Sequence, residues 1–179
     1  MATVNLHPSS TNAIDANWDL VGSAGTAHEA LADSDDATLI RNDVQNEVVI
    51  FLLDDYSSGG TIDSIRFYVR GVLFNTRSGN TDIQVKLTNS SDTSLWAETV
   101  TLNFTGGYVP EDHYGTARTT SSGLGAGWTS SDLDGLRLNI NTSPEDPPGV
   151  SYAQITKAYV EVTYTEAVTD NAVFFGCNF

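Results

Sequence analysis

The chain has 179 residues, of which 23 are acidic and 8 are basic, so its formal net charge is −15. A field of this sign repels phosphate backbones and anionic lipids, so we expect neither nucleic acid nor a membrane as a partner. Hydrophobic residues make up 40% of the chain, which is typical of one globular domain with its own core. No apolar run approaches the ~20 residues of a membrane span, and no secretory signal is expected at the start. The single cysteine, Cys177, excludes a disulfide within the chain.

Alternation of apolar and polar residues predicts strands through most of the chain. In chain order, the expected strands cover 47–54, 61–74, 81–88, 94–104, 136–140 and 153–164. The first is a continuous apolar run, which suits a strand buried on both faces. The alternating strands predict a core that contains Ile65, Phe67, Val69, Ile83, Val85, Leu87, Val160 and Val162. Arg66, Tyr68 and Arg70 fall on the opposite face of their strand.

Segments rich in Gly, Asn, Asp, Ser and Pro separate these strands and indicate tight turns. Six to eight strands at this spacing predict an all-β fold, a single antiparallel β-sandwich that is jelly-roll-like. We assign residues 18–165 to the sandwich, 1–17 to an N-terminal arm and 166–179 to a C-terminal tail. Both termini are expected to be extended. Each is either an arm or an edge strand completed by a neighbouring chain.

One helical turn is expected near 130–135, directly before the strand 136–140. Thr129 and Asp132 make an acidic capping pair at its start. Leu133 and Leu136 are three residues apart and face the same side of the turn. Together with Trp128, these two leucines form a predicted structural lid over an open end of the sandwich.

Signatures of catalysis or metal binding are weak in this sequence. The histidines at 7, 28 and 113 are far apart, and none has the spacing of metal ligands. Acidic clusters at 33–38 and 52–58 could supply oxygen ligands to calcium, although plain solvated turns are the simpler interpretation. Carboxylates for glycoside hydrolysis need not be adjacent, so a glycan-active enzyme is kept as a third and least favoured function. We therefore predict no catalytic residue, no metal, no cofactor and a non-enzymatic protein.

Exposed aromatic side chains would indicate sugar binding, because aromatic faces stack on sugar rings. Trp18, Trp96 and Trp128 are the candidates. Trp96 alternates with core positions, and the other two precede predicted elements. We therefore interpret all three as buried side chains that fill the core or close the ends of the sandwich.

Several segments together resemble a pattern found in virion structural proteins of tailed bacteriophages. The matching residues are Trp18 and Gly22, the acidic segment LADSDDATLI (31–40), the strand IRFYVR (65–70), the segment GWTSSDLDGLRL (127–138) and the final strand YVEVTY (159–164). The resemblance covers about residues 18–165. It implies a non-enzymatic structural protein of the β-sandwich decoration or tail type, with no catalytic residues to carry over.

The resemblance also implies a place on the virion, which is assembled in the host cytoplasm. The chain has no fibre stalk and no collagen-like or heptad repeat, so we expect a cement-type decoration protein on the capsid exterior. Its expected partners are the major capsid protein and further copies of itself. The alternative is a tail or tail-tip adhesin module that binds host surface glycans.

The C-terminal tail ends in the apolar stretch NAVFFGCNF. Such a segment is an aggregation hazard when exposed, so we expect it to dock on a neighbouring copy or on the capsid. The expected anchors are Val173, Phe174, Phe175 and Phe179.

Overall fold

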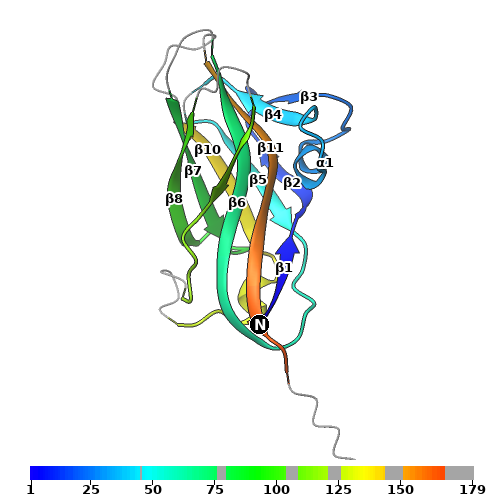
Figure 1. The fold of residues 1–179 in the computed structure, drawn as a ribbon, viewed down its shortest axis with the longest axis vertical. Coiled ribbons are helices and arrows are strands. Elements are labelled where there is room, and N and C mark those ends of the chain that lie inside the picture. The colour runs from blue at the N-terminus through cyan, green and yellow to red at the C-terminus, as the bar shows by residue number, and fades with distance from the viewer. Residues whose placement is uncertain (45, 76–79, 104–108, 121–125, 144–150, 168–179) are drawn as a thin grey trace, which may run out of the picture.

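The computed structural model describes residues 1–44, 46–75, 80–103, 109–120, 126–143 and 151–167. Within these residues, two antiparallel sheets pack face to face (Figure 1). This arrangement confirms the predicted all-β class and the single antiparallel sandwich. None of the described helices is long and apolar enough to cross a membrane.

The two sheets are built from strands that lie far apart in the sequence. Sheet A has the order β3 (Asp19–Val21), β4 (Leu39–Asn42), β11 (Ser151–Thr165), β6 (Thr61–Asn75) and β9 (Glu111–Tyr114), and β1 (Ala2–Leu6) also pairs with β11. Sheet B has the order β2 (Pro8–Ile14), β5 (Val48–Leu53), β10 (Arg137–Ser143), β7 (Asn80–Thr88) and β8 (Ser94–Asn103). Two short helices, α1 (Ala27–Ala32) and α2 (Ser130–Leu133), are added to these strands.

The core lies between the sheets, where the residues predicted to point inward meet. Each of the eight is at most 1% exposed: Ile65, Phe67, Val69, Ile83, Val85, Leu87, Val160 and Val162. The prediction of these core positions is confirmed. β5 differs from the expected strand buried on both faces, because Val48, Ile50 and Leu52 are only half-buried. The outer face of sheet B meets solvent there, as one face of an antiparallel sheet commonly does.

The N-terminal segment is part of the sandwich, which corrects the expectation of an arm over residues 1–17. β1 pairs with β11 in sheet A, and β2 pairs with β5 in sheet B. The chain therefore changes sheets at His7, between these two strands. Leu6 is 1% exposed and anchors the segment in the core. The many Ser, Thr and Asn residues of this segment conceal its alternation in the sequence.

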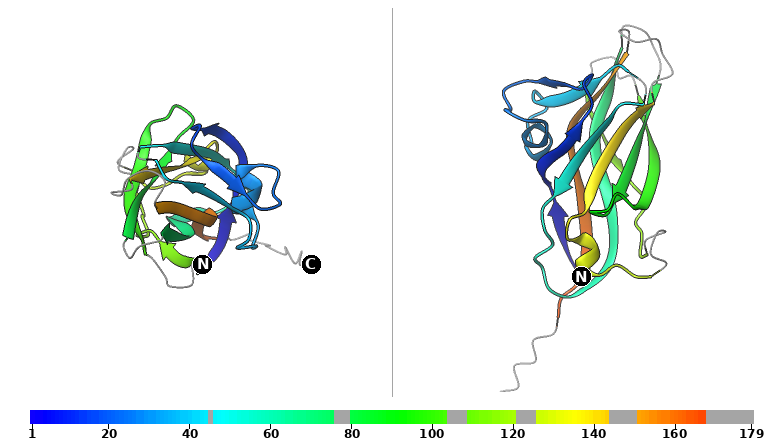
Figure 2. Two further views of the ribbon diagram at one scale, coloured as in Figure 1. Left: turned by 90° about the horizontal axis from the view of Figure 1, so that it is seen from above. Right: turned by 180° about the vertical axis from the view of Figure 1, so that it is seen from behind.

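Helix α1, which the sequence did not predict, closes one lateral opening between the sheets (Figures 1 and 2). It contacts β2 of sheet B and both β4 and β11 of sheet A. Thr26 caps its start, because the Thr26 hydroxyl accepts a hydrogen bond from the backbone N–H of Glu29 at 3.4 Å. Its own residues Ala30 and Leu31 are fully buried. Six residues are too few to show a helical period in the sequence.

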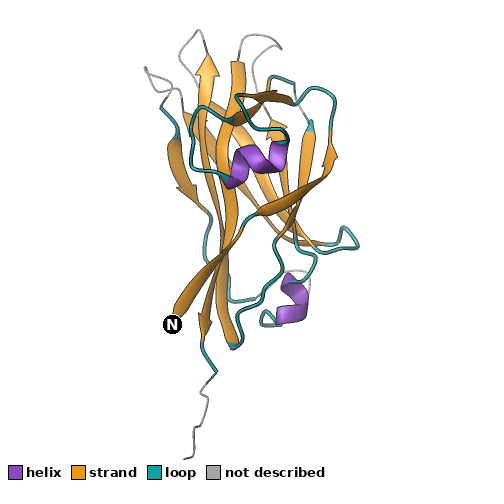
Figure 3. Ribbon diagram, turned by 90° about the vertical axis from the view of Figure 1, so that its right-hand side faces the viewer, coloured by secondary structure: helices purple, strands orange, loops and turns teal. Residues whose placement is uncertain are grey.

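Helix α2 forms where the sequence predicts a helical turn, at the end of the sandwich near the N-terminus (Figure 3). The Asp132 carboxylate accepts hydrogen bonds from the backbone N–H and the hydroxyl of Thr129, at 2.8 and 2.6 Å. Trp128, Leu133 and Leu136 are all buried. Burial of these three residues is what the predicted lid requires, and their role as a lid over this end of the sandwich stays a prediction.

The expected tail anchors Val173, Phe174, Phe175 and Phe179 lie outside the described residues, as does Cys177. Docking of the tail on a partner therefore stays a prediction.

Replacing Phe67 with alanine should lower the free energy of unfolding by about 3–5 kcal/mol, because a fully buried ring is lost. This ring contacts Trp96 on the opposite sheet, with ring centroids 5.0 Å apart. Equilibrium urea denaturation measures the change. Ile14→Ala is the control, since Ile14 is 45% exposed on β2 and should cost less than about 1 kcal/mol. A similarly small loss for Phe67→Ala would contradict the core position of β6.

Candidate functional site

The outer face of sheet A carries a continuous row of aromatic side chains. Tyr68 on β6 is paired directly with Tyr159 on β11 and with Tyr114 on β9. His7, which follows β1, lies at the other end of the row. Successive ring centroids are 5.4 Å apart for His7 and Tyr159, 4.4 Å for Tyr159 and Tyr68, and 5.0 Å for Tyr68 and Tyr114. We call these four residues the tyrosine row. In-register antiparallel pairing produces the row, because directly opposite residues share a face of the sheet.

Exposure differs strongly along the tyrosine row. Tyr68 and Tyr159 are stacked with an interplanar angle of 19° and are only 6% and 9% exposed. Tyr114, on the edge strand β9, is 51% exposed. The guanidinium of Arg66 lies 4.5 Å from the centre of its ring, and Arg66 also donates to Glu161 at 2.7 Å. Tyr114 is therefore held in place by neighbours and still offers aromatic surface to a ligand.

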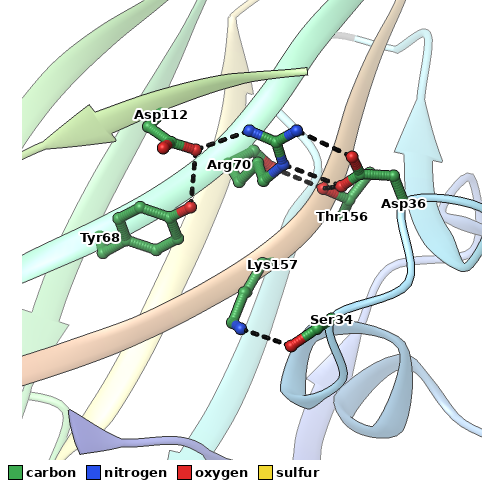
Figure 4. Close-up of a pocket in the computed structure, with 7 residues that line it drawn as sticks. All are labelled: Ser34, Asp36, Tyr68, Arg70, Asp112, Thr156 and Lys157. Atoms are coloured by element: carbon green, nitrogen blue, oxygen red, sulfur yellow. Dashed lines mark hydrogen bonds and ion pairs between the residues drawn. The ribbon is translucent and has the colours of Figure 1, made fainter. Parts of the chain in front are cut away.

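A cluster of charged side chains lies beside the tyrosine row on the same face (Figure 4). Arg70 on β6 is its centre, with Lys157 on β11 and Asp112 on β9 as its paired neighbours. Arg70 donates to both carboxylate oxygens of Asp36 at 2.8 Å and to Asp112 at 2.7 Å. The hydroxyl of Tyr68 also donates to Asp112, at 2.7 Å. We call Asp36, Arg70, Asp112 and Lys157 the charged cluster.

A β-bulge in β11 brings the loop after α1 into this cluster. The register shifts between Ile155 and Lys157, and the hydroxyl of Thr156 donates to Asp36 at 3.0 Å. The ammonium of Lys157 donates to Ser34 in the same loop, also at 3.0 Å. The loop that carries Asp36 is thus fixed on the sheet at two points.

The acidic segment 33–38 is a turn whose residues 34–37 are exposed, as the sequence favours, and its side chains make specific contacts. Asp33 accepts a hydrogen bond from the hydroxyl of Thr38 at 2.6 Å, and Asp36 pairs with Arg70. Across the described ranges, no group of three or more His, Cys, Asp or Glu side chains could hold a metal ion.

Hydrogen bonds set the protonation states in the charged cluster. Arg70 holds the pKa of Asp36 below its usual value, and the hydroxyl of Tyr68, followed by Arg70, does the same for Asp112. Burial raises the pKa of Tyr159 to about 12 and also raises the pKa of Tyr68. At neutral pH both carboxyls are therefore ionised and both phenols are neutral.

His7, at the β1 end of the tyrosine row, is also uncharged at neutral pH. Burial lowers the pKa of His7, and the nearby Lys157 lowers it further. The His7 ring that contacts Tyr159 is therefore a neutral imidazole at neutral pH.

The charged cluster lines an open pocket of about 320 Å³. The lining residues are Ser34, Asp36, Tyr68, Arg70, Asp112, Thr156 and Lys157. This volume lies at the small end of the range for ligand pockets, and its wall combines one aromatic ring with convergent polar groups. The pocket and the exposed ring of Tyr114 together form the candidate site.

The sequence located this face only in part. It placed Arg66, Tyr68 and Arg70 opposite the core, which the structure confirms. It did not connect them with the partners on β9, on β11 and in the loop after α1. A usable signal was present, since aromatic and charged residues also occupy the non-core positions of the segments 112–114 and 157–161.

The three tryptophans do not belong to this site. Trp18, Trp96 and Trp128 are 6%, 4% and 5% exposed, which confirms that they are buried side chains.

Comparisons with known proteins give distant similarities of fold. No protein-family model and no curated protein matches the sequence. A similar solved structure is the CBM36-1 domain of a multidomain xylanase from the hindgut metagenome of Trinervitermes trinervoides, at 11% identity and a TM-score of 0.46, covering 93% of this chain and 100% of that one. Another is the Agl-KA catalytic domain, at 12% identity and a TM-score of 0.49, covering 93% of this chain and 28% of that one.

A third similar structure is the carbohydrate-binding module CBM36 in complex with calcium and xylotriose. It is 10% identical with a TM-score of 0.35, and the match covers 91% of this chain and 100% of that one. These similarities concern the sandwich alone.

Replacing Arg70 with methionine should lower the free energy of unfolding at neutral pH and have almost no effect on it under the most acid conditions. Folding lowers the pKa of Asp36 and Asp112 from about 3.8, so their stabilising effect is present above about pH 4 and is lost as the pH falls through the lowered values. Both carboxylates are about half exposed, at 46% and 50%, so solvent screening keeps the loss at pH 7 near 1 kcal/mol.

Urea denaturation at pH 7, 4 and 2.5 measures this difference between the wild type and Arg70→Met. Arg41→Met is the matched control, because Arg41 makes a 3.3 Å ion pair with the more exposed Asp19 at the opposite edge of sheet A, where β3 pairs with β4. Its effect should be smaller at every pH. A loss for Arg70→Met that is equal at pH 7 and pH 2.5 would contradict the role of the two carboxylates.

Proposed function

We propose that this chain is a non-catalytic module that binds carbohydrate on the outer face of sheet A. The observation that carries the proposal is the position of the half-exposed Tyr114 beside the open pocket of the charged cluster. A sugar ring presents C–H groups on its faces and hydroxyls around its rim. An aromatic ring next to charged hydrogen-bonding groups complements both features.

The pocket offers both kinds of hydrogen-bonding partner that hydroxyl groups need. The ionised carboxylates of Asp36 and Asp112 accept hydrogen bonds, and each oxygen can accept more than one. Lys157 has three donors, of which the hydrogen bond to Ser34 uses one. A ligand can therefore add to this network without breaking the ion pairs of Arg70.

The same contacts prepare the site before a ligand arrives. The rings of Tyr68 and Tyr159 fix each other, and Arg70 is held by two carboxylates. These residues stand on the long strands β6 and β11, so little side-chain freedom is lost on binding.

The protonation states support binding and oppose hydrolysis at this site. A glycosidase uses a pair of carboxyls, one of which has a raised pKa and donates a proton to the leaving oxygen. Hydrogen bonds from Arg70 lower the pKa of Asp36, and hydrogen bonds from Tyr68 and then from Arg70 lower the pKa of Asp112. Neither carboxyl of this pocket holds a proton to donate at neutral pH.

The place of such a module on a phage particle stays a prediction. The residues that carry the resemblance to virion proteins lie mainly in β6, β11, the segment of α2 and β10, and the loop between α1 and β4. Several of these residues also belong to the candidate site, among them Asp36, Tyr68 and Arg70. Carbohydrate binding agrees with the tail or tail-tip adhesin reading, whereas capsid decoration would depend on the anchors outside the described residues.

Tyr114→Ala should weaken glycan binding about tenfold, which corresponds to about 1.4 kcal/mol, and should leave the melting temperature within a few degrees. The fold tolerates the change because Tyr114 is half exposed on an edge strand. A glycan array identifies the ligand of the full chain, and titration calorimetry then measures the affinity. Leu20→Ala is the control, since Leu20 is 39% exposed on the distant edge strand β3.

Two results would overturn the proposal. The first is an array on which the folded full chain binds no glycan. The second is a bound glycan whose affinity is the same for the wild type, Tyr114→Ala and Lys157→Ala. Co-sedimentation with undecorated capsids in the absence of glycan binding would favour the decoration protein instead.

A further inference from the structure

A second cavity lies where the segment after β9 passes the edge strand β8. After β9 the chain continues along β6 and reaches Arg118, whose backbone exchanges two hydrogen bonds with Ile65 at 3.0 and 2.8 Å. The indole of Trp128 fixes the same residue by donating to its carbonyl at 2.9 Å. The backbone of Arg118 is therefore held firmly, and its side chain lies beside the edge strand β8 of sheet B.

This lateral crevice has a volume of about 190 Å³ and is lined by Trp96, Ala97, Arg118 and Thr120. At about 30 Å³ for each water molecule, it holds the volume of about six waters. The crevice therefore has room for one small ring or its acidic substituent, and not for a folded peptide or a helix.

The guanidinium of Arg118 is the chemical feature of the crevice. It lies over the indole of Trp96, with its central carbon 5.6 Å from the ring centroid. A cation–π contact of this kind positions the charge and uses none of the five N–H donors. Among the described residues, Arg118 forms no ion pair, although the chain has 23 acidic residues.

The acidic neighbour on β8 is already engaged. Glu98 accepts hydrogen bonds from the backbone N–H of Thr116 at 3.1 Å and from the Thr116 hydroxyl at 3.0 Å. It thereby fixes the segment that carries Arg118 and does not neutralise the guanidinium. The indole N–H of Trp96 is also buried with no partner in the described part of the chain.

The charge of the whole chain restricts the kind of anion that fits this site. A net charge of −15 repels densely charged polymers, whereas at physiological salt a single carboxylate mainly senses charges within about 8 Å. The planar fork of arginine matches a carboxylate with two parallel hydrogen bonds.

We propose that the lateral crevice binds the carboxylate of an acidic sugar, with Arg118 as the bidentate donor and Trp96 as the ring that positions the guanidinium. The inference rests on the proposed carbohydrate-binding function and adds a ligand class to it. Tyr114 and Arg118 are four residues apart, so at most about 13 Å of chain separates them. Tyr114 pairs with Tyr68 on the outer face of sheet A and Arg118 pairs with Ile65 on its core side, so the crevice is a subsite separate from the ring of Tyr114.

The test uses the full chain and three acidic probes, each with a matched neutral sugar. The probes are a galacturonate trimer, a glucuronate-containing disaccharide and sialyllactose, and calorimetry measures their affinities. At least one acidic probe should bind ten times more tightly than its neutral counterpart. Arg118→Gln should abolish that preference, and Arg118→Lys should restore only part of it because lysine keeps the charge and loses the fork.

Arg41→Gln is the matched control and should leave the preference unchanged. Trp96→Phe removes one tryptophan fluorophore from the crevice. A ligand-induced change in tryptophan fluorescence that disappears in this variant therefore comes from the crevice. Equal affinity for acidic and neutral sugars, or a preference that survives Arg118→Gln, overturns the inference.

The failures of the two proposals are distinguishable. Neutral sugars that bind through Tyr114, without any acidic preference, leave the proposed function standing and remove the acidic subsite. An acidic preference that depends on Arg118 and is unaffected by Tyr114→Ala keeps the acidic subsite and removes the proposed binding site on the outer face of sheet A. A folded chain that binds none of the six sugars and no glycan on an array contradicts both.

Discussion

The in-register pairing of β6 with β11 is the constraint on which the rest of the structure depends. On one face it aligns Phe67 with Val160, and both are buried between the sheets. On the other face it aligns Tyr68 with Tyr159 and Arg66 with Glu161. Because side chains alternate along a strand, a slip of one residue would expose the core and bury the charges. One register therefore fixes both the stability of the sandwich and the chemistry of its outer face.

The charged cluster shows how a polar site is added to this frame. Arg70 is 25% exposed, and an arginine so enclosed needs partners for its donors. Asp112 comes from the edge strand β9, and Asp36 comes from a loop that is distant in the sequence. The bulge that brings out Thr156 adds the contact that holds this loop. The ion pairs thus order two surface segments around the pocket, even though their net contribution to stability is modest.

The segment that follows β9 connects the two candidate binding sites and depends on close packing. A side chain at Gly115 would place its first carbon 2.5 Å from the ring of Phe67, which no real contact allows. The glycine therefore lets this segment lie directly over the core ring. Tyr114 precedes the contact and Arg118 follows it, so the positions of both residues depend on packing against the same buried phenylalanine. Rigid placement of this kind is what a binding site on a sheet edge requires.

The sequence by itself determined the all-β class, the core faces of the long strands and the helical turn of α2. Each of these follows from local periodicity or capping, as for Phe67 and for Thr129 with Asp132. Only the tertiary structure decided the paths of β1 and β2, whose polar residues hide their alternation, and the place of helix α1. It alone also decided the site, because Asp36 and Arg70 are brought together across 34 residues. Strand order and loop contacts are long-range properties, and no local pattern encodes which distant partner will complete a row or a charge.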